Sequence, residues 1–118
     1  MGIMRELTSN ERQLLEKLLE PDFPGRDELR SQVANSKVRT LHEDGTLEFV
    51  EVGGPTASVV QRIPVEATYD DRDGIAILVL LHVIDGKLNE LEIVKFGDSP
   101  IVWPPTPDRL HPKPNLQP

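Results

Sequence analysis

The stretch Ile75–Ile84 reads Ile-Ala-Ile-Leu-Val-Leu-Leu-His-Val-Ile, and it is apolar at both odd and even positions. Side chains alternate between the two faces of a strand, so this pattern predicts a strand buried on both faces in the middle of a sheet. Asp85-Gly86 follows as a two-residue turn signal, and Leu88–Phe96 has the composition of a strand that returns antiparallel. The sequence therefore predicts a β-hairpin at the centre of the fold.

Helical patterns precede this hairpin. In Thr8–Glu20, Thr8 is placed as an N-cap with Glu11 three residues later, and four leucines share one face. A shorter helix is expected over residues 27–33. Further strands are expected at residues 38–42, 46–52 and 59–69. The chain thus predicts an α+β fold: two N-terminal helices packed on one face of a mainly antiparallel, five-stranded meander sheet.

The C-terminal part of the chain is rich in proline. Seven of the eleven prolines lie at positions 100, 104, 105, 107, 112, 114 and 118. Proline blocks helices and central strands, so we expect one α+β domain over residues 1–103 and a Pro-rich, extended or disordered tail over residues 104–118. Ile101 and Trp103 are apolar exceptions within this region. They are expected to anchor the chain on its own domain or, alternatively, to bind a partner.

Composition narrows the class of protein. The net charge is −7 with no cluster of Lys and Arg, which argues against nucleic-acid binding. The chain contains no cysteine, so disulfides and Cys-ligated zinc are excluded. No run of about 18 apolar residues exists, so no membrane span is expected. We expect a cytoplasmic protein with no cofactor and no metal site.

The candidate chemistry lies on the central hairpin. Glu90 and Glu92 are two residues apart on a strand and share a face, and paired carboxylates suit acid–base work. His82, at the end of the apolar strand, is a candidate base or a hydrogen-bonded core residue. The alternative for the acids is that Leu88–Phe96 is an edge strand whose charges prevent edge-to-edge pairing.

Two registers of the hairpin are compatible with the sequence. A two-residue turn opposes His82 with Asn89 and points it away from Glu90 and Glu92. A three-residue loop with a glycine bulge opposes His82 with Leu88 and puts it on the same face as both acids. The register therefore decides whether the three side chains converge.

Several segments of the sequence resemble a family. The run Leu80-Leu81-His82-Val83, then Asp85-Gly86-Lys87-Leu88, then Glu90-Leu91-Glu92-Ile93 is similar to a widespread group of small bacterial proteins of unknown function. An opening helix followed by Phe23-Pro24-Gly25 belongs to the same pattern, which covers about residues 7–101. The resemblance implies a bacterial cytosolic setting and supports the fold, but it carries no catalytic residues.

These observations favour a non-catalytic protein-binding module, for example an immunity-type protein that masks a basic surface. The alternative is a small-ligand-binding protein or an acid–base enzyme that uses His82, Glu90 and Glu92; whether the protein is an enzyme stays open, with the balance against it. The second face of strand Ile75–Ile84 needs cover, which we expect from Ile101–Trp103 or from a second subunit in a homodimer.

Overall fold

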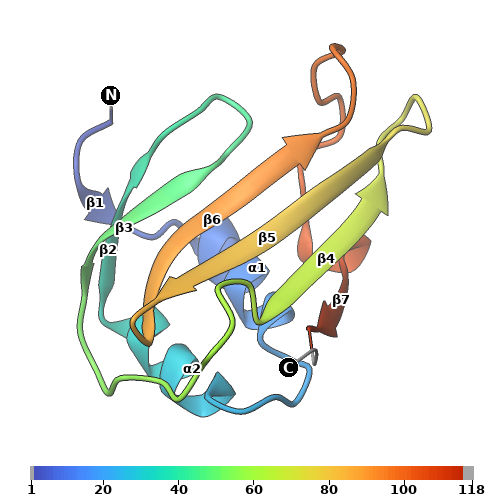
Figure 1. The fold of residues 1–118 in the computed structure, drawn as a ribbon. Helices are drawn as coiled ribbons and strands as arrows, with labels where there is room; N and C mark the ends of the chain where they lie inside the picture. The colour runs from blue at the N-terminus through green and yellow to red at the C-terminus, as the bar shows by residue number, and fades with distance from the viewer. Residues whose placement is uncertain (1, 116–118) are drawn as a thin grey trace.

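A computed structural model describes residues 2–115 as one seven-stranded antiparallel sheet with two α-helices (Figure 1). The strand order across the sheet is β1-β2-β3-β6-β5-β4-β7. The helices are α1 (Ser9–Leu18) and α2 (Arg26–Ala34). The strands are β1 (Arg5–Glu6), β2 (Ser36–Thr40), β3 (Leu47–Val52), β4 (Val65–Asp70), β5 (Ala76–Ile84), β6 (Lys87–Lys95) and β7 (His111–Pro114), and a 3-10 turn spans Pro107–Arg109.

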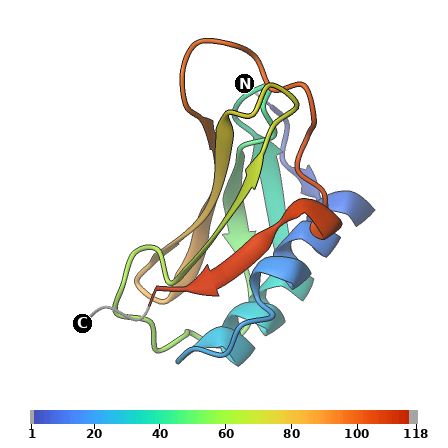
Figure 2. The same cartoon turned by 90° about the vertical axis from the view of Figure 1, so that its right-hand side faces the viewer.

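Both helices lie on the same face of the sheet, which we call the core face (Figure 2). The predicted N-cap is confirmed: Thr8 and Glu11 form a reciprocal capping box, and α1 buries its leucines. The core consists of these leucines and of the side chains that the strands direct toward them. In the part of the chain that the structure describes, no helix or strand lies over the opposite face, which we call the open face.

The α+β class and the two helices on one face are confirmed, but the predicted five-stranded meander is wrong. Seven strands are present, and β3 lies beside β6 instead of β4. The connection after β3 carries the chain past the hairpin to form β4 on its far side. Strand β6 is therefore internal to the sheet, so the explanation of its acids as protection of an edge is also wrong.

The two faces of β5 differ in burial. Leu81, Val79 and Ile77 on the core face are fully buried, whereas Leu78 and Leu80 on the open face are half-buried. The expected cover from residues 101–103 does not form over the open face, because Ile101 packs against the core cluster. The central position of β5 was predicted correctly, and its burial on both faces was not.

The β5–β6 hairpin combines a two-residue turn with a bulge. Ile84 pairs with Lys87 and Val83 with Leu88, but the next pair is His82 with Glu90, so Asn89 is an extra residue on β6. Asp85 and Gly86 both have positive φ, as a tight type I′ turn requires. The two-residue turn considered from the sequence is therefore correct and the three-residue loop is wrong, but neither register includes the bulge at Asn89.

The buried side chain of Gln32, on α2, holds this turn and bulge in place. Its amide nitrogen donates to the carbonyl oxygens of Gly86 (2.9 Å) and Pro55 (2.7 Å), and its amide oxygen accepts from the Leu88 amide (2.9 Å). These bonds satisfy backbone groups that the bulged hairpin cannot pair within the sheet. A single side chain thus ties α2, the hairpin turn and the β3–β4 connection together.

The segment that follows the proline-rich run is ordered as far as residue 115. The sequence predicts an extended or disordered tail here; the structure has a 3-10 turn followed by the extended strand β7, which pairs with β4. Leu110 between them is 2% exposed and belongs to the core. Within the predicted tail, His111–Pro114 therefore adds a strand to the sheet. Residues 116–118 lie outside the described range.

The prolines of β7 explain how such a sequence can form a strand. The Asn115 amide donates to the Pro64 carbonyl, so the odd-numbered amides of β7 point toward β4. Pro112 and Pro114 then occupy the positions whose nitrogen faces away from the sheet. Their missing N–H groups cost no ladder bond, and the outer edge of β7 offers no donor there to another strand.

Replacement of Leu110 by alanine tests this packing. We expect Leu110→Ala to lower the free energy of unfolding by about 2–5 kcal/mol, the range for a buried leucine. Val60→Ala is the matched control, because Val60 is 97% exposed, and it should change stability by less than about 0.5 kcal/mol. Urea unfolding followed by circular dichroism measures both. Equal, small effects would show that the segment after Pro107 does not pack on the core.

Candidate functional site

His82, Glu90 and Glu92 meet on the open face of the β5–β6 hairpin. One ligand atom from each lies within 4.8 Å of the others. His82 pairs directly with Glu90, and Glu92 lies one pair further along, opposite Leu80. The sequence-based expectation that Asn89 or Leu88 opposes His82 is wrong, because the bulge shifts the register beyond both alternatives.

Both nitrogens of the His82 ring are hydrogen-bonded. The Arg62 Nε donates to Nδ1 at 3.0 Å, and Nε2 lies 2.8 Å from a Glu92 carboxylate oxygen. An arginine N–H can only donate, so Nδ1 must be an acceptor and the proton of the neutral ring must be on Nε2. The His82 side chain is 11% exposed, and its ring connects the Arg62 guanidinium to the Glu92 carboxylate.

This arrangement limits the chemistry of His82. A general base needs a ring nitrogen that faces a substrate, and both are engaged. A metal-bound histidine usually donates its second nitrogen's proton to a carboxylate or carbonyl. Here Arg62 occupies the second nitrogen as a donor, which keeps the proton on the nitrogen that would bind the metal. The three residues therefore do not fit a metal ion.

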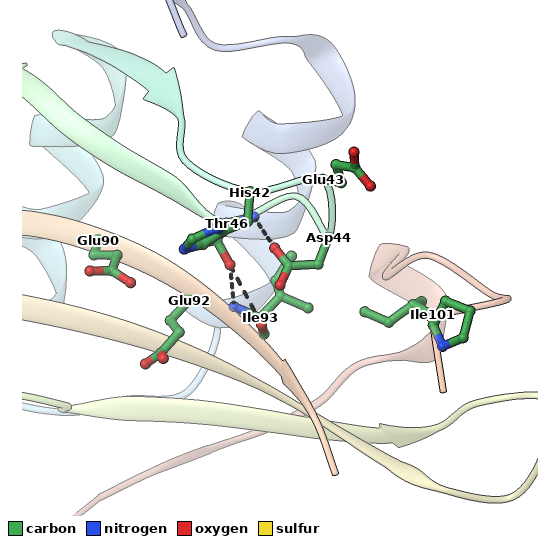
Figure 3. Close-up of a pocket in the computed structure, with 9 residues that line it drawn as sticks. His42, Glu43, Asp44, Thr46, Glu90, Glu92, Ile93 and Ile101 are labelled. Atoms are coloured by element: carbon green, nitrogen blue, oxygen red, sulfur yellow. Dashed lines mark hydrogen bonds between the residues drawn. The ribbon is translucent and has the colours of Figure 1, made fainter. Parts of the chain in front are cut away.

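An open pocket of about 660 Å³ lies next to this cluster (Figure 3). One wall is the loop between β2 and β3, another is β6, and the third is the segment after β6. Glu90 and Glu92 of β6 belong to its lining, whereas His82 does not. The lining residues are His42, Glu43, Asp44, Thr46, Glu90, Glu92, Ile93, Pro100 and Ile101.

The pocket exists because β3 separates from β6. Only two residue pairs join these strands, Leu47 with Leu91 and Glu48 with Glu90. Beyond these pairs, the Thr46 hydroxyl takes the place of the backbone hydrogen bonds between β3 and β6. It accepts from the Ile93 amide (3.0 Å) and lies 3.5 Å from the Ile93 carbonyl oxygen. The β2–β3 loop, through His42, Glu43 and Asp44, then forms one side of the open pocket.

The pocket is acidic. Four of its nine lining residues carry carboxylates, and none is lysine or arginine. Two nearby basic side chains are paired with carboxylates outside the pocket, Arg39 with Glu48 and Lys95 with Asp71 and Asp73. A third, Arg62, is hydrogen-bonded to His82. The carboxylates of the pocket therefore face the solvent without a neutralising cation among the lining residues, which favours a positively charged ligand.

The residues proposed as partner contacts, Ile101 and Trp103, have different surroundings. Ile101 lines the pocket and packs on the core. The Trp103 side chain is 41% exposed, and the Arg109 guanidinium lies 5.0 Å from its ring centroid. The Tyr69 hydroxyl donates to the Trp103 carbonyl at 2.8 Å. The backbone of Trp103 is thus anchored, while its ring is accessible.

Asp71 holds the backbone of residues 102–103 in place. Its carboxylate accepts from the backbone amides of Val102 (2.9 Å) and Trp103 (2.8 Å) and from the Lys95 ammonium group (2.8 Å). Burial by itself would raise the pKa of Asp71, but the Lys95 ammonium and the backbone amides outweigh burial and hold the pKa well below its usual range. In the sequence, residues 70–74 have only the acids and glycine typical of a turn, which does not indicate this role of Asp71.

The pocket residues His42, Glu43 and Asp44 were also missed. In the sequence, Glu43-Asp44-Gly45 has the residue types of a β-turn, and His42 is the residue just before it. Their place beside Glu90 depends on the long-range pairing of β3 with β6, for which no local pattern in the sequence gives a signal.

The protein is thus an α+β domain in which helices cover one face of the sheet and leave the other face open. An acidic pocket lies at the border of the open face. The chain belongs to the family described as "Domain of unknown function (DUF6984)", whose model matches residues 4–105. No curated protein and no solved structure matches the chain. Within residues 2–115, no helix is long and apolar enough to cross a membrane.

Substitution of Asp71 tests the anchor. We expect Asp71→Asn to loosen residues 101–103, because the amide loses the ion pair with Lys95 and one of its two acceptor atoms. Trp103 fluorescence should shift to the red, and the urea midpoint should fall. Asp73→Asn is the control, since Asp73 also binds Lys95 but is exposed. Equal effects of both variants would contradict a special role for Asp71.

Tyr69 gives a prediction at alkaline pH. Burial, together with the charge of Asp71, raises the pKa of Tyr69 to about 12 from 10.0, against the effect of Arg109. Between these values the unfolded chain ionises first, so the free energy of unfolding should fall as pH rises from 10 toward 12. Urea unfolding at several pH values measures this slope. Tyr69→Phe should flatten it; an unchanged slope would contradict the assignment.

Proposed function

We propose that this protein is a non-catalytic binding module that receives a basic segment of a partner protein on the open face of its sheet. The observation that carries this proposal is the acidic pocket beside β6, with four carboxylates and no lysine or arginine in its lining. A lysine or arginine side chain supplies the missing charge, and arginine can also donate two parallel hydrogen bonds to one carboxylate.

The surroundings of the pocket support a protein ligand. The open face continues from Glu90 and Glu92 across the half-buried side chains of Leu78, Leu80 and Val94. Apolar surface beside a charged pocket is the composition of a protein interface, in which charge steers the encounter and apolar contacts hold the complex. The net charge of −7 favours a basic protein and disfavours nucleic acid.

Binding is a better explanation of the cluster than catalysis. His82 has no ring nitrogen available, so an acid–base reaction would have to use Glu90 and Glu92 without it. As a positioning residue, His82 fixes the orientation of Glu92 at the pocket. One specific form of the proposal is an immunity-type protein in the bacterial cytoplasm that masks the basic surface of its partner.

The pocket volume also favours a second candidate, a small cationic ligand, since about 660 Å³ lies within the range of small-molecule sites. Free arginine and a tetra-arginine peptide separate the two possibilities. A protein-binding module should prefer the peptide strongly, because further basic residues contact the open face. A small-ligand site should bind free arginine at least as tightly.

The test is calorimetric titration of the protein with tetra-arginine at low salt. We expect Glu90→Gln with Glu92→Gln to weaken binding about tenfold, since loss of two charge contacts at the surface amounts to roughly 1–2 kcal/mol. The matched control is Glu16→Gln with Asp22→Asn, which makes the same change in net charge at exposed sites away from the pocket. Equal weakening by both double variants would show attraction without a site, and the proposal would fail.

A further inference from the structure

The His82 ring lies between two groups that favour opposite protonation states. Arg62 donates to Nδ1 and is positively charged, so it favours the neutral ring. Glu92 accepts from Nε2 and is negatively charged, so it favours the cationic ring. A proton taken up at Nδ1 would point at the Arg62 N–H, and a hydrogen bond cannot form between two donors.

Charged groups reach the ring from three sides. Glu90 and Glu92 face it from β6, and Arg62 faces it from the β3–β4 connection. On β4, Glu66 pairs with Leu80 and so lies diagonally across from the ring. Beyond β6, Glu48 pairs with Glu90 and is itself bound by Arg39. Strand β5 contributes no charged group apart from the ring. Arg62 is therefore the cation that a proton on Nδ1 would confront.

Arg62 can respond without unfolding of the hairpin. Its backbone carbonyl is fixed by the Val83 amide at 2.7 Å, so the main chain remains in place. Its side chain belongs to an exposed residue and can turn into solvent. The ring, by contrast, is nearly buried and bounded by Glu92. Protonation should thus move the guanidinium and leave the ring where it is.

We propose that His82 is a proton-operated switch: uptake of a proton at Nδ1 releases the Arg62 side chain and leaves a cationic ring between Glu90 and Glu92. Histidine is the side chain suited to such a change near neutral pH. The consequence for binding rests on the proposed function. A positive charge next to two carboxylates that line the pocket weakens its attraction for a basic ligand, so acidification should release that ligand.

Nuclear magnetic resonance of the free, full-length protein tests the switch without any ligand. Long-range ¹H–¹⁵N spectra of the histidine rings should show His82 with its proton on Nε2 at about pH 8 and with both nitrogens protonated at about pH 5. The Arg62 Nε–H signal should shift and lose its protection from exchange with the same midpoint. His42 and His111 are exposed and serve as control rings, whose signals should show no coupling to the Arg62 signal.

Two results would overturn the switch. One is a His82 proton on Nδ1 instead of Nε2 at about pH 8. The other is an Arg62 Nε–H signal that does not change together with protonation of the His82 ring; a ring that takes up no proton by about pH 5 counts as this second result. His82→Gln supplies the matched variant, because its amide offers a donor and an acceptor but does not titrate. The Arg62 signal of this variant should not change with pH, and a change would contradict control by His82.

Binding of tetra-arginine at the same pH values separates the two proposals. In the wild-type protein the affinity should fall several-fold between about pH 8 and about pH 5, and His82→Gln should lose most of this dependence. Absence of binding at any pH would refute the proposed function, while the ring and Arg62 signals would still decide the switch. Equal pH dependence in both proteins would refute the link from His82 to the pocket.

Discussion

The register of the β5–β6 hairpin is the constraint on which the rest of the structure depends. Leu88, Leu91 and Ile93 all reach the core, and the spacing of three between the first two breaks the alternation of a regular strand. The bulge at Asn89 absorbs the extra residue. Without it, Glu90 and Glu92 would face Leu81 and Val79 in the core, where two uncompensated carboxylates would cost far more than a bulge. Gln32 stabilises this bulged register by bonding to the Gly86 carbonyl in the turn and to the Leu88 amide just after it.

Much of the fold could be predicted because its signals are local. The capping box at Thr8, the turn at Asp85-Gly86 and the apolar run of β5 each report on a few neighbouring residues. The strand order could not be predicted in the same way, since a meander and the observed order use nearly the same strands. The pairing of β3 with β6 decides between these two strand orders. It depends on how side chains far apart in the sequence pack together, and no local pattern reports that.

The same difference between local and long-range signals applies to the candidate site. The sequence shows that the hairpin register decides whether His82 meets Glu90 and Glu92. The signal that identifies the register is the spacing of three between the apolar residues Leu88 and Leu91, which a regular strand does not have, and this signal was overlooked. Arg62 could not have been placed, because it reaches the ring from an irregular connection. The acids of the β2–β3 loop join the pocket only through long-range pairing. Site and fold thus share one origin, in that the bulge that keeps acids out of the core also presents them at the pocket.

The prolines of β7 have a consequence for the order in which the sheet can form. During synthesis, β4 leaves the ribosome well before β7, and β3 well before β6, so two strand edges remain unpaired while the intervening chain is made. Each partner then has to close a long loop, which makes these pairings slow compared with the β5–β6 hairpin. Pro112 and Pro114 leave the donors of β7 on one side only, so the arriving strand can complete the sheet without recruiting a second chain. The nascent protein is therefore most vulnerable to wrong association before β7 arrives.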